Sequence, residues 1–375
     1  MAKITSATLE DNEPLVSIVL TTYNSQIIIE QVLRAIVDQK FPLEKVELII
    51  VDGGSRDKTL ELIQAFLKGN AHHFYDVKVI IHDKNYGVSK ARNDGMKVSR
   101  GRYVLILDHD VVMRGETLRS LIEYLETSPE NVGVAVPLFH TVKGRLLNAW
   151  QERIFENKVV KVDFIADCAL IRRKVIEHVG YYNETLGPPH TICEEREYGA
   201  RVEAKGYEIH QIGWVKADHY QGIEESNVNI ETPNQHVAGK NLKSLVPTQL
   251  VTGLNLLSDF RYRQALREWI VSMPGFKRLK WRLYSVLIPM LATAVFVALA
   301  FRVISPLIIS AFVTFALYLD TLKQYWNPKI PHISLLYSVV ALAWRIARSI
   351  MLLIPAKVFA ELKGKHPGDH RCSEC

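Results

Sequence analysis

Four apolar, strand-like segments alternate with segments of helical spacing near the start of the chain. The apolar segments occupy residues 14–25, 46–57, 76–83 and 102–110. After the first of them, apolar residues recur every three or four positions, at Ile29, Val32, Leu33 and Ile36. The alternation of strands and helices predicts an α/β fold with a doubly wound, mostly parallel sheet and right-handed crossovers.

Polar residues follow the end of each predicted strand. They are Asn24, Asp52, Asn85 and the pair Asp108 and Asp110. Ligands of doubly wound sheets bind outside the carboxyl ends of the strands, so we expect these residues to line one crevice. Adjacent carboxylates repel each other unless a cation or hydrogen-bond donors compensate their charge. The pattern therefore predicts a ligand site at this edge.

Two common kinds of nucleotide site are excluded. The first strand-to-helix turn, TTYNSQ, has no glycine, whereas a dinucleotide fingerprint needs glycine for the close approach of a pyrophosphate. The chain also has no GxxxxGK(S/T) sequence. A dinucleotide-binding fold and a P-loop are therefore not expected.

Two uncharged apolar runs occupy residues 283–301 and 303–319. At about 1.5 Å of rise per residue, nineteen helical residues span roughly the 30 Å hydrocarbon core of a bilayer. We therefore expect a transmembrane helical hairpin over residues 283–322, with buried helices of a soluble bundle as the alternative. The pattern of residues 333–354 predicts an interfacial amphipathic helix or a third crossing. The other faces of this helix are apolar, and one face carries Ser338, Ala341, Arg345 and Arg348.

The charge distribution favours a membrane partner. The formal net charge is +6, and the basic cluster GFKRLKWR at 275–282 directly precedes the first apolar run. The positive-inside rule and the lack of a secretory signal at residue 1 predict a multi-pass protein of the cell membrane with its N-terminal domain in the cytoplasm. We expect contact with membrane lipids and none with nucleic acid.

Four cysteines are too few and too scattered for a disulfide framework. The tail nevertheless brings together His366, His370, Cys372 and Cys375. A zinc site and a disordered tail are both compatible with this cluster.

Several motifs together resemble glycosyltransferase family 2. They are VSIVLTTYN, LIIVDGGSRDKT, NYGVSKARNDGMKVSRGRYVLILDHDV and CALIRRKVIEHVGYYNETL. The resemblance covers residues 14–225 and implies a GT-A catalytic domain, in a chain similar to membrane-bound mannosyltransferases. We expect an N-terminal extension (1–13), this domain, an amphipathic interfacial linker (226–282), the membrane helices and a tail (355–375).

The resemblance implies a metal site at the sequence DHD. Asp110 would bind Mn²⁺ or Mg²⁺, and Asp108 would contact the ribose or a metal-bound water. A later histidine, His219, would be a second metal ligand. His109 is expected to point to the other side of the strand end. Hard oxygen ligands such as carboxylates suit these cations.

The resemblance also implies a nucleotide-sugar site. Asp52 would accept hydrogen bonds from the base, with Thr22 and Tyr23 beside it and Asn24 and Asn85 in the same crevice. Arg92 would contact the ribose or diphosphate, and Lys90 is a weaker candidate for the diphosphate. The chain has VDGGS where the family has VDDGS, so one acidic residue is missing.

The segment TICEEREYGARVEAKGYEI is similar to the family's GEDxDL motif, whose acid is the general base of an inverting displacement. Aligned through Gly206 and Tyr207, Glu194 and Glu195 take the two acidic positions. Glu195 stands where an aspartate is usual. The alternative is that both acids only complement the dipole of the helix that they open.

The predicted function is transfer of one sugar from a nucleotide diphosphate sugar, with GDP-mannose slightly favoured, to a lipid-linked hydroxyl acceptor at the cytoplasmic face. A polyprenyl (dolichyl) phosphate sugar synthase and a catalytically inactive membrane adaptor are the alternatives. Basic residues that could hold a lipid diphosphate, or only face the membrane surface, are Arg261, Arg263 and Arg267.

Overall fold

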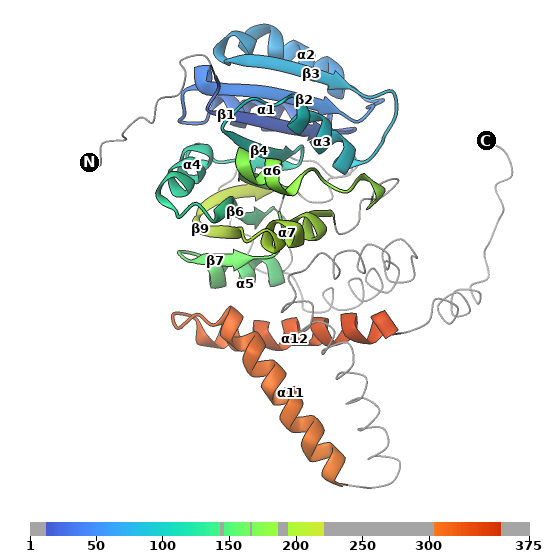
Figure 1. Cartoon of the computed structure of the whole chain (residues 1–375), viewed down its shortest axis with the longest axis vertical. Helices are drawn as coiled ribbons and strands as arrows, with labels where there is room; N and C mark the ends of the chain where they lie inside the picture. Colours follow the sequence, from blue (N-terminus) through green and yellow to red (C-terminus); the bar gives the residue numbers. More distant parts are fainter. Residues whose placement is uncertain (1–12, 143–145, 166, 187–193, 221–303, 354–375) are drawn as a thin grey trace, which may run out of the picture. The chain divides into compact units, whose positions relative to one another are not determined.

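The computed structural model describes residues 13–142, 146–165, 167–186, 194–220 and 304–353 (Figure 1). The chain divides into two compact units, and the described residues up to 220 belong to the first and those from 304 to the second. Several predicted features lie outside the described residues: most of the N-terminal extension, the linker with its arginines, the crossing at 283–301 and the His/Cys tail.

A single mixed sheet forms the centre of the first unit, in the order β3-β2-β1-β4-β8-β6-β9-β5, with β7 paired to β9. The strands are β1 (Val16–Thr22), β2 (Val46–Asp52), β3 (Asp76–Ile81), β4 (Tyr103–Asp108), β5 (Val111–Met113), β6 (Val132–Thr141), β7 (Val159–Val162), β8 (Cys168–Arg172) and β9 (Glu208–His219). The helices are α1 (Ile29–Val37), α2 (Thr59–Asn70), α3 (Val88–Val98), α4 (Thr117–Thr127), α5 (Leu146–Phe155), α6 (Arg173–Val179) and α7 (Glu194–Ala204). Single 3₁₀ turns are η1 (Leu43–Lys45), η2 (Ala71–His73) and η3 (Glu184–Leu186).

The parallel, doubly wound prediction is confirmed for the first four strands. β1 pairs in parallel with β2 and β4, and β2 pairs in parallel with β3. The second half of the sheet is mixed, so a mostly parallel sheet is wrong there: β6 is parallel to β9, but β8 is antiparallel to β4 and β6, and β9 is antiparallel to β5 and β7. Antiparallel neighbours need no helical crossover, so the helix spacing does not reveal them.

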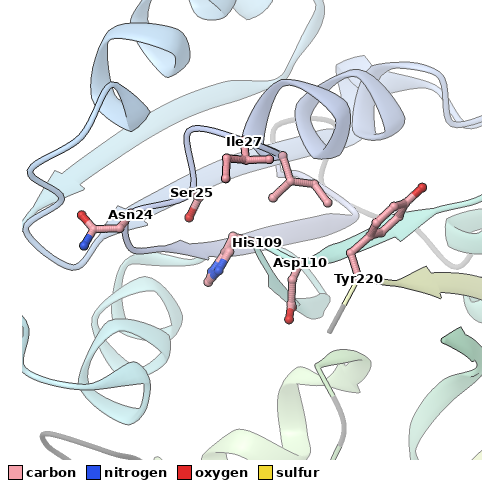
Figure 2. Close-up of a pocket in the computed structure, with 7 residues that line it drawn as sticks. Asn24, Ser25, Ile27, His109, Asp110 and Tyr220 are labelled. Carbon is pink, nitrogen blue, oxygen red and sulfur yellow. The ribbon is translucent and has the colours of Figure 1, made fainter. Parts of the chain in front are cut away.

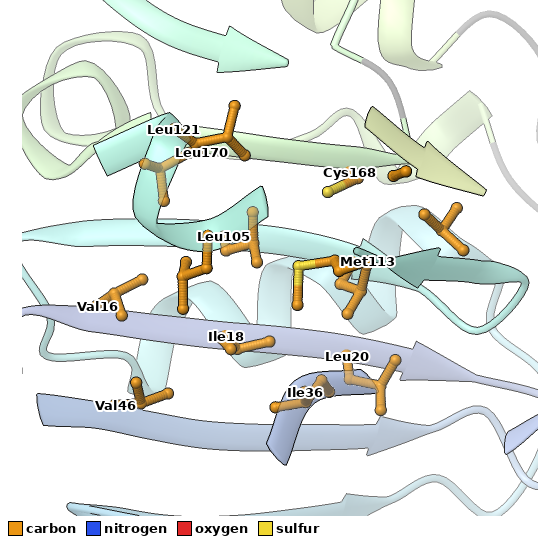
Figure 3. Close-up of a cluster of buried hydrophobic side chains, with 14 of the residues drawn as sticks. Val16, Ile18, Leu20, Ile36, Val46, Leu105, Met113, Leu121, Cys168 and Leu170 are labelled. Carbon is orange, nitrogen blue, oxygen red and sulfur yellow. The ribbon is translucent and has the colours of Figure 1, made fainter. Parts of the chain in front are cut away.

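Buried side chains cover both faces of the sheet. On one face Ile18 and Leu20 of β1 belong to the same cluster as Ile36 of α1 (Figure 3). On the other face Val19 belongs to a cluster with Met96 of α3. Successive strand residues point to opposite faces, so helices on both sides explain why every residue of β1 is buried and its centre is apolar. The strand ends thus emerge between α1 and α3.

The second unit contains the helices α11 (Ile304–Tyr325) and α12 (Pro331–Leu353), which pack against each other. The turn between them is held by a hydrogen bond from Asn327 N to Ser334 Oγ of 3.0 Å. The helices α11 and α12 coincide closely with the segments 303–319 and 333–354, which were predicted to be helical. None of the helices in the described part of the chain combines the length and the hydropathy that a membrane crossing requires. The predicted crossing at 303–319 is therefore not confirmed.

Candidate active site

The carboxyl ends of β1, β2 and β4 lie at one edge of the sheet. In the register of these strands Thr22 is opposite Asp52, and Thr21 is opposite Asp108. Each threonine donates a hydrogen bond to the acid beside it, from Thr22 Oγ1 to Asp52 Oδ2 at 2.9 Å and from Thr21 Oγ1 to Asp108 Oδ1 at 2.8 Å. The structure thus brings the predicted strand-end residues together.

Asp52 has no exposed surface, and its carboxylate binds groups of the chain itself. Oδ1 accepts from Gly54 N and Ser55 N at 3.0 and 2.8 Å. Oδ2 accepts from Ser55 Oγ at 2.6 Å as well as from Thr22. A carboxylate offers about four acceptor positions, so these four bonds use its capacity. In this conformation Asp52 shapes the loop after β2, and its predicted contact with a base stays a prediction.

Tyr23 and Asn24 form the turn that follows β1. The Tyr23 side chain is exposed and lies beside Gly53. Asn24 has a φ of 47°, in the left-handed region that asparagine tolerates better than most residues. Its conformation is held by hydrogen bonds from Asn24 N to Ser55 Oγ and from Arg56 N to Asn24 Oδ1. The turn therefore leaves the Tyr23 ring exposed and fixes Asn24 against the loop after β2.

Two residues that were predicted to contact the nucleotide, Asn85 and Lys90, are bonded to neighbouring residues of the chain instead. Asn85 is exposed, and its Oδ1 accepts a hydrogen bond of 2.8 Å from Gly87 N. Lys90 Nζ lies 2.5 Å from each carboxylate oxygen of Asp94, one helical turn away. A contact between Lys90 and a diphosphate would require this ion pair to open.

Arg92 lies among the acidic residues of the site, and its side chain is 1% exposed. Its guanidinium binds Asp108 through Nη2–Oδ2 at 2.5 Å and Nε–Oδ1 at 3.3 Å. Nη2 is 3.4 Å from Glu195 Oε1, and Nη1 is 3.7 Å from Glu194 Oε1. Burial opposes its charge, but Asp108 and the other carboxylates hold the pKa of Arg92 well above its usual value. The arginine therefore organises the carboxylates of the protein itself.

Glu194 and Glu195 open α7, where acidic residues complement the helix dipole. Burial, and then the neighbouring charge of Asp167, raise the pKa of Glu195 well above its ordinary value. Burial also raises the pKa of Glu194, although Arg92 opposes this. A raised pKa makes a carboxylate a stronger base. Glu195 therefore has the environment of a general base in addition to a favourable place on the helix.

Asp167, which directly precedes β8, belongs to the site although no sequence motif predicts it. Its backbone oxygen accepts a hydrogen bond of 2.9 Å from Asp108 N. Its carboxyl group is hydrogen-bonded to Glu195 and lies 3.6 Å from both Arg92 Nη2 and His219 Nε2. The only signal in the sequence is an acid immediately before an apolar run. Because β8 is antiparallel to β4, the start of β8 meets the end of β4.

Asp110 and His219, the two principal metal ligands of the prediction, are adjacent, with Asp110 Oδ2 and His219 Nε2 3.2 Å apart. Tyr220 N donates to Asp110 O at 2.8 Å, which joins the end of β9 to the turn after β4. Burial disfavours the charge of His219, but the hydrogen bond to Asp110 raises its pKa. No group of three or more His, Cys, Asp or Glu side chains is arranged as a metal site within the described residues.

The donor set nevertheless fits a hard divalent cation. Mg²⁺ sites of phosphate-transferring enzymes typically use one or two carboxylates, and substrate phosphates and water complete the coordination. Asp110 offers such a carboxylate, and His219 lies beside it. Five acidic residues surround the cation Arg92 or contact His219, and they are Asp108, Asp110, Asp167, Glu194 and Glu195. An added cation would offset this excess of negative charge.

A pocket of about 190 Å³ adjoins Asp110 (Figure 2). It is lined by Asn24, Ser25, Ile27, Ile28, His109, Asp110 and Tyr220. The predicted orientation of His109, away from the ligand residues, is wrong. β4 ends at Asp108, so His109 lies in the turn before β5, where the alternation of strand side chains no longer applies.

Residues 17–180 match the family model described as glycosyl transferase family 2. The chain contains a glycosyltransferase family 2 domain. The minor teichoic acid biosynthesis protein GgaB of Bacillus subtilis is 28% identical over 212 residues, which are 52% of this chain and 23% of GgaB. The putative teichuronic acid biosynthesis glycosyltransferase TuaG of the same species is 32% identical over 113 residues, 30% of this chain and 42% of TuaG. This glycosyltransferase domain thus matches less than half of the length of either relative.

The fold is also that of a solved enzyme. The mannosyltransferase PcManGT from Pyrobaculum calidifontis, in complex with GDP-Man and Mn²⁺, has a TM-score of 0.52 and covers 88% of each chain at 17% sequence identity. Identity at this level shows a shared fold alone. The GT-A-like architecture expected of the family 2 domain is therefore confirmed.

Proposed function

We propose that the protein is a metal-dependent, inverting glycosyltransferase that moves one sugar from a nucleotide diphosphate sugar to a hydroxyl group of a lipid-linked acceptor. One observation carries this proposal. Arg92 is bonded to Asp108 and lies 3.4 Å from Glu195 Oε1, so a base-like carboxyl group stands beside the DHD turn of a family 2 domain.

Asp110 and His219 would hold Mn²⁺ or Mg²⁺ together with the diphosphate of the donor. The cation supplies Lewis acidity that stabilises the charge developing on the leaving diphosphate. Arg92 and the Thr21 hydroxyl orient the Asp108 carboxylate through hydrogen bonds. Asp110 and His219 would therefore position the donor, and Arg92 holds Asp108 in place beside them.

Glu195 would act as the general base. It accepts the proton of the acceptor hydroxyl while the acceptor oxygen bonds to the anomeric carbon and the bond from that carbon to the diphosphate oxygen breaks. Attack opposite the leaving group inverts the anomeric configuration. A hydroxyl acceptor needs such a base, whereas an ionised polyprenyl phosphate does not. Glu195 is half-buried, and the raised pKa of its carboxyl group supports the hydroxyl acceptor.

The identity of the donor and the location of the domain are also proposals. GDP-mannose is the donor that we favour, and it is the sugar nucleotide bound in the PcManGT structure. We place the domain at the cytoplasmic face of the cell membrane, because the basic cluster at 275–282 precedes the uncharged run at 283–301.

The test is thermal unfolding of the full chain in detergent with GDP-mannose, UDP-glucose, UDP-GlcNAc and dTDP-glucose, each with Mn²⁺ or with EDTA. A ligand that binds only the folded state raises the Tm. We expect a metal-dependent rise with one donor, which Asp110→Ala abolishes and Asp38→Ala, an exposed aspartate at the far end of α1, retains. A panel without any metal-dependent rise would contradict the proposal and favour an inactive adaptor.

A further inference from the structure

An aromatic side chain, Tyr182, packs against the guanidinium of Arg92. Tyr182 lies between α6 and η3, and Arg92 Cζ is placed over its ring, 5.3 Å from the ring centroid. The negative face of an aromatic ring attracts a cation, most strongly where water is excluded. Both side chains are buried. The ring therefore contacts the residue that binds Asp108 and approaches Glu195.

Asn93, the residue after Arg92, fixes the backbone of Tyr182. Asn93 Nδ2 donates a hydrogen bond of 2.9 Å to Tyr182 O, and Tyr182 N donates one of 2.8 Å to Asn93 Oδ1. Both bonds are buried, where the low local dielectric strengthens them. Two consecutive residues of α3 thus contact the backbone and the ring of Tyr182.

Tyr182 also stacks on Tyr198 of α7. The two ring centroids are 4.3 Å apart and the ring planes differ by 18°. Tyr198 is itself buried, and its hydroxyl donates a hydrogen bond of 2.9 Å to Gly180 O. Residues three apart are neighbours on a helix, so Tyr198 lies on the side of α7 that also carries Glu195. The stacked rings therefore join α3 to the helix of the proposed base.

Arg92 can bind the ring and the carboxylates at the same time. A guanidinium carries its N–H donors along its edge, so contact with an aromatic ring does not displace the acids. Nη2 lies 2.5 Å from Asp108 Oδ2 and 3.4 Å from Glu195 Oε1. An arginine side chain has many rotamers, and contact with the ring limits those open to Arg92.

We propose that Tyr182 is a positioning residue, whose ring holds Arg92 toward Asp108 and sets the distance from Arg92 to Glu195 on α7. The inference rests on the proposed function, in which Glu195 is the general base. Tyr182 is only 3% exposed, so it acts through Arg92 and not on the substrate. The ring is the active part, since the buried Tyr182 hydroxyl has no hydrogen-bond partner among the described residues.

The test is the turnover of Tyr182 variants of the full chain in detergent, well below the Tm of each variant. The assay measures nucleoside diphosphate released from GDP-mannose, UDP-glucose, UDP-GlcNAc or dTDP-glucose with Mn²⁺ and octyl glucoside as the hydroxyl acceptor. We expect Tyr182→Leu to lower kcat about tenfold, as for one lost buried cation–π contact, and to change the KM of the donor by less than about twofold. Tyr182→Phe keeps the ring and should retain kcat within about twofold. Tyr182→Met, which fills space without a ring, replaces Tyr182→Leu if that variant does not fold.

The neighbouring residue Tyr181 provides a matched control. It is 42% exposed, and Lys97 Nζ lies over its ring at 5.5 Å from the centroid. Tyr181→Leu removes the same kind of contact away from the site and should leave kcat unchanged. A double-mutant cycle then tests the route through Arg92. In the Arg92→Lys background, Tyr182→Leu should lower kcat by less than about twofold, because the interaction is already weakened.

The outcomes separate this inference from the proposed function. A Tyr182→Leu variant with a lower Tm and an unchanged kcat would show that the ring only stabilises the fold, and would overturn the inference alone. Equal fold losses in the wild-type and Arg92→Lys backgrounds would overturn the route through Arg92. A loss in Tyr182→Phe as large as in Tyr182→Leu would assign the effect to the hydroxyl and overturn the role of the ring. A wild-type protein that releases no diphosphate from any donor would contradict the proposed function, and this inference with it.

Discussion

Arg92 and Asp108 form a bidentate ion pair that joins α3 to the carboxyl end of β4. The Arg92 side chain is 1% exposed and the Asp108 side chain 15%. The pair therefore lies at the floor of the site, where water screens it little. Its integrity bears on both the stability of the domain and the orientation of Glu195.

Arg92→Ala should lower the free energy of unfolding by roughly 3 kcal/mol, because it leaves buried carboxylates without their partner. Arg92→Lys should recover part of this loss, since it keeps the charge but not the bidentate geometry. Urea denaturation measures the effect. The control is Arg102→Ala, whose exposed pair with Glu126 should contribute less than about 1 kcal/mol. Equal losses in the two alanine variants would refute the prediction.

Glu195→Gln should reduce kcat by about 10²- to 10⁴-fold and leave nucleotide affinity nearly unchanged, because glutamine keeps the shape of the side chain but cannot accept the proton. Steady-state kinetics and nucleotide titration measure the two quantities. Glu194→Gln, the neighbouring acid, should have the smaller effect on kcat. Undiminished turnover in Glu195→Gln would point to a phosphate acceptor, which needs no base.

The pH dependence of kcat should show the raised pKa of Glu195. A base acts in its deprotonated form, so activity is present above its pKa and is lost as the pH falls through it. The acidic midpoint should therefore lie well above 4.5, the ordinary value for glutamate. Asp167→Asn removes a neighbouring negative charge and should move the midpoint to lower pH. A midpoint at or below 4.5 in the wild type would exclude Glu195 as the titrating base.

Glu47 should make the stability of the domain sensitive to acid. Its buried carboxylate accepts hydrogen bonds from Ser17, Lys78 and Arg100. Burial opposes ionisation, but these donors lower the pKa of Glu47. The stabilisation from ionised Glu47 is fully present above the pKa that Glu47 has in the unfolded chain. It is lost as the pH falls through the lower pKa that Glu47 has in the folded domain. Glu47→Gln should cost about 2 kcal/mol at pH 7, and the deficit should shrink below about pH 4.5 in urea titrations. A deficit that does not change with pH would argue against this role.

Gly95 and Gly69 offer a matched pair of helix substitutions. A Cβ at Gly95 on α3 would lie 2.2 Å from Val19 Cγ1, whereas none of the neighbouring atoms lies within 4 Å of a Cβ at Gly69 on α2. Gly95→Ala should destabilise the domain by about 1–3 kcal/mol through overpacking, despite the better helix propensity of alanine. Gly69→Ala should stabilise it by about 0.5–1 kcal/mol. Thermal unfolding of both variants checks the expected opposite signs.

The first four strands and the helix α1 were predictable because their signals are local. An apolar run of β-branched residues followed by helical spacing identifies each unit, and the four buried positions of α1 coincide with the predicted face. The convergence of Asp52, Asp108 and Asp110 followed from one rule, since parallel strands end at the same edge.

The part of the site beside β8 could not be predicted from the sequence. Asp167 meets Asp108 only because β8 runs antiparallel to β4, with Cys168 opposite Leu107. Strand direction depends on pairing between distant segments, and no local pattern encodes it. Lys90 is paired with Asp94, and Asp52 accepts hydrogen bonds from its own loop. These side-chain contacts likewise cannot be predicted from a sequence motif.

The α/β class, the positions of the first four strands and the acidic edge of the sheet are readable from the sequence, because periodicity and strand-end position are properties of neighbouring residues. The order of the strands in the sheet, the pairing of the charges, the side that His109 faces and the place of Asp167 in the site are visible only in the folded chain. Those outcomes arise from packing and electrostatics among segments far apart in the chain, where burial makes each ionised group depend on the partners that the fold brings to it.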